Sequence, residues 1–146
     1  MDDGPPELIL SVSLMTHPNS LSRQHTVLLV EDDDLVLDAM TRMLVREGYL
    51  VLTAASGHDA ISLLHTPLQP INVVVLDVNL PDVSCIDLCA RIRELHPSMP
   101  VVVCTGSTNP LDLAELLRMG VSRCFHKPVP MADLLASVEA AMPCAG

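Results

Sequence analysis

Acidic side chains stand directly after two of the short apolar runs in this chain. Glu31 and Asp32 follow the run VLLV, and Asp77 follows the run VVVL. Two carboxylates about 5 Å apart repel each other by roughly 3 kcal/mol at an effective dielectric constant of about 20, so a cluster of them requires a cation. A few carboxylate oxygens suit Mg2+, which keeps several of its waters and favours sites that include a phosphate oxygen. If the two runs are neighbours in space, these acids form a candidate Mg2+ site.

The acids also have ordinary structural interpretations. An Asp that ends a strand before a proline-containing loop, as Asp77 does, is more often a turn or capping residue than a catalytic one. Asp33 and Asp34 continue the acidic run, and we expect them to cap the following helix and favour its dipole. Glu31 and Asp32 come earlier, and we expect them to face the crevice at the end of the strand.

A hydroxyl and an ammonium group follow two further apolar runs. Thr105 ends the run VVVCT, and Lys127, the one lysine of the chain, stands directly before Pro128. A compact ammonium charge is what a phosphoryl oxygen or a buried carboxylate would attract. A lone lysine is usually a solvated surface residue, however, and a β-branched Thr often simply ends a strand. From the residues alone, both interpretations stay open.

The elements that would position these residues alternate along the chain from Thr26 onward. Short runs that are apolar on both faces are typical of buried parallel strands, and the segments between them carry apolar residues at helical spacing. Gly48 and Gly120 stand where a helix ends in a left-handed residue. Strands are predicted at residues 26–30, 50–54, 72–76, 100–104 and 122–126, and helices at about 33–46, 57–65, 84–95, 108–119 and 130–142. The pattern predicts an α/β fold, a doubly wound five-stranded parallel sheet with helices on both faces.

One domain is expected over residues 25–146, with no room for a second. Residues 1–24 have the composition of a flexible extension, with three prolines and three acids. Within them the apolar stretch Leu8 to Met15 is interrupted by serines, and the acidic start of the chain is unlike a secretion signal. The alternation of apolar residues at positions 10, 12 and 14 leaves an additional edge strand as an alternative.

Charge and composition argue against several classes of partner. The chain of 146 residues has a formal net charge of -10, one Tyr, one Phe and no Trp. Binding to free nucleic acid needs basic charge and stacking surfaces, so it is not expected. No membrane insertion is expected either, because a spanning helix needs about 20 apolar residues in succession. Five cysteines without a CxxC pair do not suggest a disulfide framework. We therefore expect a cytoplasmic protein with reduced thiols.

Four blocks of the sequence resemble the motifs of response regulator receiver domains, the phosphorylated modules of two-component signalling. The blocks are VLLVEDD at 27–33, VVVLDVNLPD at 73–82, VVVCTG at 101–106 and FHKP at 125–128. The resemblance extends over residues 26–142, and the blocks follow in the family's order. It implies the flavodoxin-like strand order 2-1-3-4-5 of the chemotaxis regulators, in which the first and third strands are adjacent.

The resemblance gives the acids a specific role. Asp77 would be the phosphoacceptor, which takes a phosphoryl group from a histidine kinase or a histidine phosphotransfer protein. Glu31, Asp32 and Asp77 would bind the Mg2+ cofactor, and Asn79 would add its backbone carbonyl as a metal ligand. Phosphoryl transfer depends mainly on positioning and charge neutralisation, which these groups would supply.

By the same resemblance, the hydroxyl and the ammonium group would act on the transferred group. Thr105 would hydrogen-bond the phosphoryl oxygens and Lys127 would pair with them, with a cis peptide bond between Lys127 and Pro128. Such a chain is a signalling switch rather than an enzyme, although it would promote its own phosphorylation and dephosphorylation. Its output would be the binding of a downstream protein target or the relay of the group.

Two places depart from the family pattern. Cys85 stands where receivers usually have a Gly, and Ser84 replaces an acid, so the backbone there is expected to be strained or reshaped. Cys124 replaces a Tyr or Phe whose rotation reports phosphorylation, and Phe125 would lie on the opposite face of the strand. The resemblance therefore does not imply that this chain signals its phosphorylation through a rotating aromatic side chain at position 124.

Other functions fit the residues less well. A pseudo-receiver, an interaction module with this fold and no phosphorylation, should lack an acid, the Thr or the Lys, and this chain lacks none. A phosphatase of the haloacid dehalogenase type needs a second Asp two residues after its nucleophile, where Asn79 stands. Dinucleotide binding needs a GxGxxG motif, which the six glycines do not form. A zinc site at Cys85 and Cys89 has no further ligands nearby.

Overall fold

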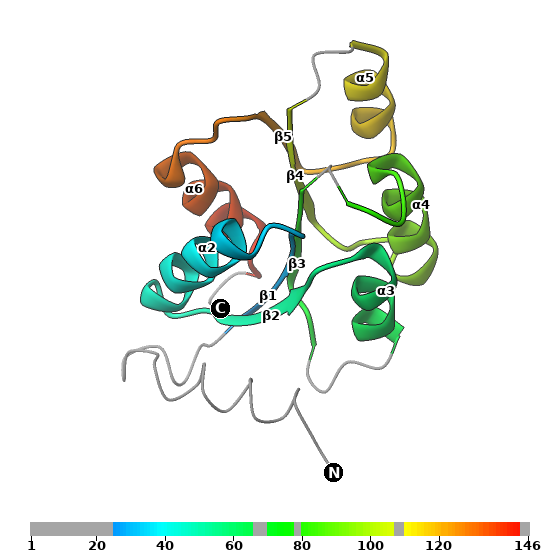
Figure 1. The fold of residues 1–146 in the computed structure, drawn as a ribbon. Coiled ribbons are helices and arrows are strands. Elements are labelled where there is room, and N and C mark those ends of the chain that lie inside the picture. Colours follow the sequence, from blue (N-terminus) through cyan, green and yellow to red (C-terminus); the bar gives the residue numbers. More distant parts are fainter. Residues whose placement is uncertain (1–24, 66–69, 78–79, 107–109, 144–146) are drawn as a thin grey trace.

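The computed structural model describes residues 25–65, 70–77, 80–106 and 110–143, so the predicted extension at 1–24 lies outside the described residues. Strands and helices alternate along this part of the chain, as the sequence predicts (Figure 1). The strands are β1 (Thr26–Val30), β2 (Leu50–Ala54), β3 (Val73–Asp77), β4 (Val101–Thr105) and β5 (Arg123–His126). The helices are α2 (Asp34–Arg46), α3 (Gly57–His65), α4 (Cys85–Leu95), α5 (Pro110–Arg118) and α6 (Met131–Ala141). None of these helices is long and apolar enough to span a bilayer.

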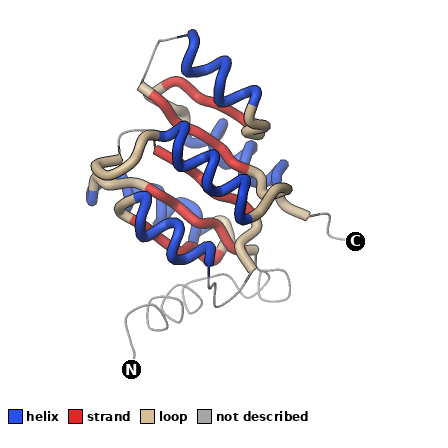
Figure 2. Tube along the Cα trace, turned by 90° about the vertical axis from the view of Figure 1, so that its right-hand side faces the viewer, coloured by secondary structure: helices blue, strands red, loops and turns tan. Residues whose placement is uncertain are grey.

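The strands form one five-stranded sheet in the order β2-β1-β3-β4-β5. Every neighbouring pair is parallel, which confirms the predicted fold class and strand order. Parallel neighbours need crossover connections, and the helices between the strands provide them. Figure 2 views the sheet from the side of α3, α4 and α5, with these helices in front of the strands. The adjacency of β1 and β3 matters most for function, because each is followed or ended by predicted site residues.

Helices cover both faces of the sheet. α2 and α6 lie on one face, and α3, α4 and α5 lie on the other (Figure 1). Alternate residues of a strand point to opposite faces, so Leu28 and Val30 pack with the side chains of α3 and α4, whereas Val27 and Leu29 pack with those of α2 and α6. Burial on both faces explains why the strands read as continuous apolar runs.

The observed strand boundaries differ from the predicted ones by one residue at most. The strands at 26–30 and 50–54 have the predicted bounds, and the other three begin one residue later. Pro100 has no N–H for the ladder, and its carbonyl accepts a hydrogen bond from the N–H of Val74 at 3.0 Å. The side chain of Asn72 accepts one from the N–H of Thr26 at 2.8 Å. Both residues therefore lie just before their strands and accept a hydrogen bond from the neighbouring strand.

Helix ends follow the predicted capping chemistry. Asp33 precedes α2, and its Oδ1 accepts hydrogen bonds from the N–H groups of Leu35 at 3.0 Å and Val36 at 3.2 Å. Asp34 is the first helical residue, where its charge favours the helix dipole. Gly48 and Gly120 have φ angles of 99° and 84°, which confirms their left-handed conformation. Only Gly adopts such angles without strain.

Candidate functional site at the carboxyl edge of the sheet

The predicted site residues share the carboxyl edge of adjacent strands. Asp77 ends β3, which lies between β1 and β4. Glu31 follows β1 directly, and Thr105 ends β4. In the register of the sheet, Asp77 pairs with Cys104, the residue before Thr105. Lys127 follows β5. The topology therefore brings to one edge residues that are far apart in the sequence.

Glu31 is a buried carboxylate at this edge, with 3% of the residue exposed. Its backbone N–H donates to the carbonyl of Ala54 at 3.0 Å, which continues the pairing of β1 with β2. Its Oε2 accepts a hydrogen bond from the N–H of Asp33 at 3.1 Å. Asp32 lies between them and is exposed. The two acids thus have different environments, although both follow β1 as predicted.

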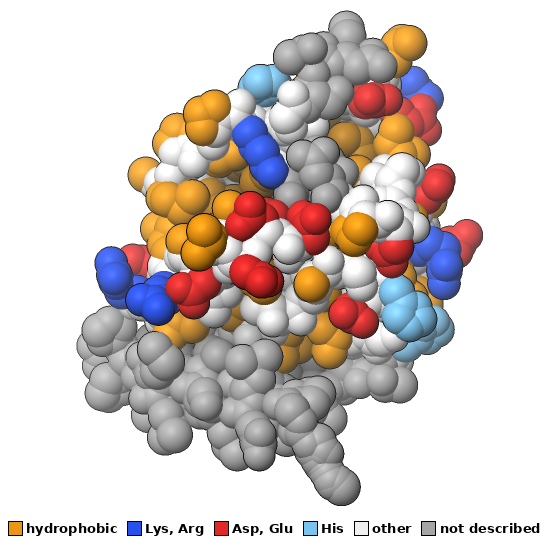
Figure 3. Space-filling model, in the orientation of Figure 1, with side chains coloured by type: hydrophobic (Ala, Val, Ile, Leu, Met, Phe, Trp, Pro, Cys, Tyr) orange, Lys and Arg blue, Asp and Glu red, His pale blue; other side chains and the backbone are white. Residues whose placement is uncertain are grey.

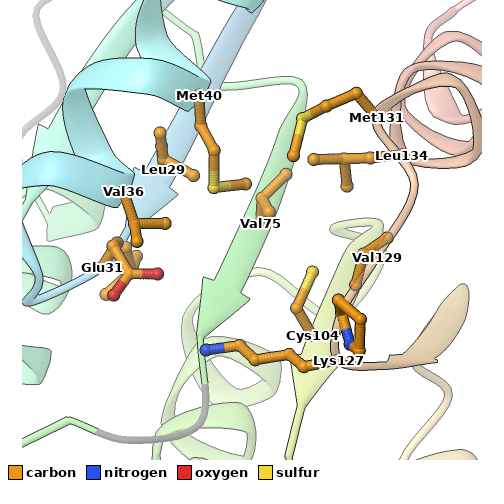
Figure 4. A pocket seen from close by; sticks show the side chains of 12 residues that line it. Leu29, Glu31, Val36, Met40, Val75, Cys104, Lys127, Val129, Met131 and Leu134 are labelled. Carbon is orange, nitrogen blue, oxygen red and sulfur yellow. The ribbon is translucent and has the colours of Figure 1, made fainter.

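A backbone hydrogen bond connects Thr105 and Lys127. The N–H of Lys127 donates to the carbonyl of Thr105 at 2.7 Å, and Thr105 is only 2% exposed. Lys127 is half-buried, and its side chain points toward the carboxyl end of β3 in Figure 4. The peptide bond between Lys127 and Pro128 is cis, as expected. Lys127 is therefore held at the sheet edge and is not a freely solvated surface residue.

Part of the predicted site lies outside the described residues. The backbone of Asp77 is described as the last residue of β3, but its side chain is not. Asn79, predicted to contribute its backbone carbonyl, also lies outside the described residues. The sheet thus places the backbone of Asp77 between Glu31 and Thr105.

The described part of the chain supplies some of the ligands that a hard cation prefers. Glu31 and Asp32 offer carboxylate oxygens from consecutive residues, and such oxygens fit Mg2+. No group of three or more His, Cys, Asp and Glu side chains forms a metal site among the described residues alone. The predicted ligand set therefore depends on Asp77, the third carboxylate, to complete it.

One contact beside the site could not be predicted from the sequence. Asp82, in the loop between β3 and α4, accepts a hydrogen bond from the N–H of Gly57 at 2.9 Å with Oδ1 and from the N–H of His58 at 2.9 Å with Oδ2. These backbone hydrogen bonds hold the pKa of the Asp82 carboxyl below its ordinary value. An acid 25 residues away thus caps α3, alongside the local cap Ser56, whose hydroxyl accepts from the N–H of Asp59 at 3.1 Å.

The backbone at Ser84 and Cys85 is ordinary, so the expectation of strain there was wrong. Ser84 has φ of -73° and ψ of 155°, and its hydroxyl accepts a hydrogen bond from the N–H of Asp87 at 3.1 Å. It is the N-cap of α4, which begins at Cys85. A helical residue needs no positive φ, so a cysteine fits this position without the freedom of a glycine. Cys85 and Cys89 are buried in the core, in agreement with a packing role.

Cys124 and Phe125 lie on opposite faces of β5, as predicted. Cys124 packs against the core beneath α3 and α4, and Phe125 packs against the core beneath α2 and α6. The guanidinium of Arg123, an exposed residue, lies 4.8 Å from the centre of the half-buried Phe125 ring, which is a cation–π contact. Burial raises the pKa of the Cys124 thiol. The aromatic ring of this strand is therefore on the face away from α4.

Comparison with known proteins identifies relatives over most of the chain. The family model for the response regulator receiver domain matches residues 27–139. The transcriptional regulatory protein AfsQ1 of Streptomyces coelicolor is 35% identical over 117 residues, which are 80% of this chain and 51% of that protein. CreB of Escherichia coli, also a transcriptional regulatory protein, is 31% identical over 80% of this chain and 50% of its own length. The chain spans about half the length of these curated relatives.

Solved structures show the same architecture. A CheY-like response regulator receiver domain protein from Methanospirillum hungatei superimposes with a TM-score of 0.75 at 27% identity, covering 80% of this chain and 92% of that one. The BeF3-activated DrrB receiver domain superimposes with a TM-score of 0.71 at 27% identity, covering 81% of this chain and 97% of that one. Both similarities extend over nearly the whole of the solved domain.

Proposed function

The chain belongs to the response regulator receiver family, and on that premise we propose that it accepts a phosphoryl group on Asp77 in an Mg2+-dependent reaction. The donor would be a histidine kinase or a histidine phosphotransfer protein. The observation that carries the proposal is the position of Asp77 at the end of β3, between Glu31 after β1 and Thr105 at the end of β4. An acid in this place can receive a group that its neighbours neutralise.

In the proposed reaction, a carboxylate oxygen of Asp77 attacks phosphorus in line with the bond that breaks. One O–P bond forms, the P–N bond to the donor imidazole breaks, and the imidazole nitrogen takes up a proton. Mg2+, bound by Glu31, Asp32, Asp77 and the Asn79 carbonyl, would neutralise charge on the phosphoryl oxygens. Lys127 would add a positive charge from the β5 side of Asp77.

Reversal of the switch would use the same groups. A water oxygen would form a bond to phosphorus while the O–P bond to Asp77 breaks, so that the carboxylate is regenerated, inorganic phosphate leaves and the proton lost by water passes to the solvent. Because the phosphoryl group is both gained and lost on Asp77, the chain would promote its own phosphorylation and dephosphorylation and would have no separate substrate. We therefore propose a signalling switch and not an enzyme in the usual sense.

Thr105 and Lys127 are suited to report the product. The phosphorylated side chain would carry a charge of about -1.5 to -2 and would attract the Thr105 hydroxyl and the Lys127 ammonium group. Thr105 is buried, and its carbonyl is bonded to the N–H of Lys127 at 2.7 Å, so a movement of one displaces the other. A complete switch needs about 5.5 kcal/mol of differential interaction, and preferential binding by a partner would supply part of it.

The proposed output is the binding of a downstream protein target, or relay of the group, in the cytoplasm. The named activity of the curated relatives is transcriptional regulation, but the chain spans about half of their length. Its formal net charge of -10 opposes contact with a phosphate backbone. Direct binding to nucleic acid is therefore no part of the proposal.

Incubation with acetyl phosphate and Mg2+, followed by intact-mass measurement, tests the proposal. We expect one phosphoryl adduct on the native chain, no adduct when Mg2+ is chelated, and none on Asp77→Asn. The control Asp59→Asn alters an exposed acid in the first turn of α3 that is not one of the predicted ligands, and it should retain the adduct. A native chain that binds Mg2+ and gains no adduct would instead be a pseudo-receiver.

A further inference from the structure

A cavity of about 470 Å3 lies between α2 and α6, next to the candidate site. Figure 4 shows Glu31 and Lys127 at one end of it. The remainder of the wall is apolar and includes Met40 of α2 and Met131 and Leu134 of α6. A concave, mainly apolar space of this size with a few polar groups is typical of a binding site.

Exposed hydrophobic side chains surround this cavity. Five large hydrophobic side chains are exposed in the described part of the chain, and three of them belong to this region: Leu35 is 83% exposed, Val36 40% and Met131 45%. Val36 and Met131 line the cavity, and Leu35 precedes Val36 in the first turn of α2. Figure 3 shows hydrophobic side chains gathered on the side where α2 and α6 lie. An apolar patch beside an apolar cavity indicates an interaction surface.

The same chain contains a segment with the chemistry to fill this surface. Residues 8–15, which lie outside the described residues, have the sequence LILSVSLM. In an extended conformation, alternate side chains point to opposite sides. Leu10, Val12 and Leu14 would then form one apolar side, while the two serines would keep their hydroxyls in water. Met40 and Met131 line the cavity, and methionine side chains have several rotatable bonds, which lets such a wall adapt to inserted side chains.

The connecting chain is long enough to reach the cavity. Residues 16–24 separate the apolar stretch from His25, where the described chain begins. Fully extended, these residues reach up to about 30 Å. The cavity lies near the opposite end of β1 from His25, and a strand of this length measures about 17 Å. A segment tethered in this way has an effective concentration in the millimolar range at its target.

We propose that residues 8–15 bind in the cavity between α2 and α6 of their own chain and cover Leu35, Val36 and Met131. Bound there, the segment lies beside Glu31 and Lys127, which stand at one end of the cavity. The other place for an alternating segment is the outer edge of β2, as an additional strand. An edge strand beside β2 would leave Leu35, Val36 and Met131 uncovered, and it would turn the two serines toward a layer of helices.

Photo-crosslinking in the full chain tests this proposal without any phosphodonor or Mg2+, so its result is separate from that of the phosphorylation experiment. Benzoylphenylalanine replaces Leu10, the protein is irradiated, and the joined peptides are identified by mass spectrometry. We expect a monomeric product with cross-links to the peptides that carry Val36, Met40 or Met131. Val36→Glu and Met131→Glu should each abolish these cross-links, because both introduce a charge into the apolar surface.

A matched control and three outcomes complete the test. Leu117→Glu alters an exposed leucine of α5, outside the cavity, and should leave the cross-links unchanged. Circular dichroism verifies that each variant is folded, which is expected because Val36 and Met131 are 40% and 45% exposed. Cross-links to residues 50–54 would establish the edge strand instead, and cross-links between two chains would establish a second copy as the occupant. Either result, or the absence of cross-links to α2 and α6, overturns the proposal.

Discussion

Asp82 and Gly57 are 25 residues apart, and the carboxylate of Asp82 accepts a hydrogen bond from the N–H of Gly57 at 2.9 Å. Asp82 belongs to the loop that follows β3, the strand ended by Asp77, and Gly57 is the first residue of α3. The loop is therefore fastened to a helix on one face of the sheet. A helix N-terminus has free N–H groups and a positive dipole end, both of which favour a carboxylate.

Removal of this cap should destabilise the fold without removing a predicted ligand. Asp82→Ala leaves two N–H groups of α3 without the carboxylate, so we expect its melting temperature at pH 7 to be a few degrees lower. The pKa of Asp82 is held below its ordinary value of 3.8, so this stabilisation is complete above that value and is lost as the pH falls through the lowered pKa. Thermal melts should therefore converge for the two proteins in strong acid. A gap that persists there would contradict the cap as its cause.

A side chain at position 57 should destabilise the fold, because it would collide with the loop that contains Asp82 and Val83. A Cβ at this position would lie 2.1 Å from Cγ1 of Val83. Gly57→Ala should therefore cost about 1–3 kcal/mol of unfolding free energy, as overpacking does. Val83→Ala removes the clashing methyl groups. The double variant should therefore lose less unfolding free energy than the two single variants lose together. Urea unfolding of the four proteins measures this coupling, and strict additivity would show that no steric contact exists.

Tyr49 should make the fold sensitive to alkali. Burial, reinforced by the charges of Glu139 and Glu47, raises the pKa of its phenol above the ordinary 10.0. A raised pKa means that the stabilisation is complete below pH 10 and is lost as the pH rises through the folded-state value. Tyr49 is the one tyrosine in a chain without Trp, so tyrosinate absorbance follows it alone. We expect a higher titration midpoint in buffer than in concentrated urea, and equal midpoints would refute the shift.

Lys127 should be needed for the response and not for metal binding. Lys127→Ala removes the ammonium group and its aliphatic stem but keeps the backbone N–H that donates to the carbonyl of Thr105. We expect Mg2+ binding to persist and the phosphorylation-dependent amide shifts of Thr105 and Gly106 to be lost, as followed by NMR. Arg123→Ala, which removes an exposed base from β5, is the control and should respond normally. Unchanged shifts in Lys127→Ala would mean that its ammonium group has no part in the switch.

The elements and the site edge could be predicted from the sequence because their signals are local. Continuous apolar runs identify buried strands, and residues such as Glu31 and Thr105 stand at strand ends, so a parallel order suffices to bring them to one edge. β3 and β4 each begin one residue later than predicted. At Asn72 a side-chain oxygen accepts the hydrogen bond from the neighbouring strand. At Pro100 there is no N–H to donate, although its carbonyl still accepts a hydrogen bond.

Contacts between distant segments could not be predicted in this way. No pattern in the sequence pairs Asp82 with Gly57, because the contact depends on how the loop after β3 packs on α3. The guanidinium of Arg93 likewise donates to the carbonyls of Met119 at 3.0 Å and Gly120 at 2.8 Å, which lie beyond β4. At Cys85 strain was expected because receivers usually have a glycine there. The expectation was wrong because Cys85 begins a helix, where a positive φ is not needed.

Localisation of the phosphoryl group tests the central claim most directly. Acids at positions 31–34 and Asp77 share the carboxyl edge, so an intact mass alone does not say which of them is modified. Borohydride reduces an aspartyl phosphate to homoserine, which peptide mass spectrometry then locates in the native chain treated with acetyl phosphate and Mg2+. We predict homoserine at position 77 and at no other acid. Homoserine at position 32, 33 or 34, with Asp77 unchanged, would contradict the assignment of the phosphoacceptor.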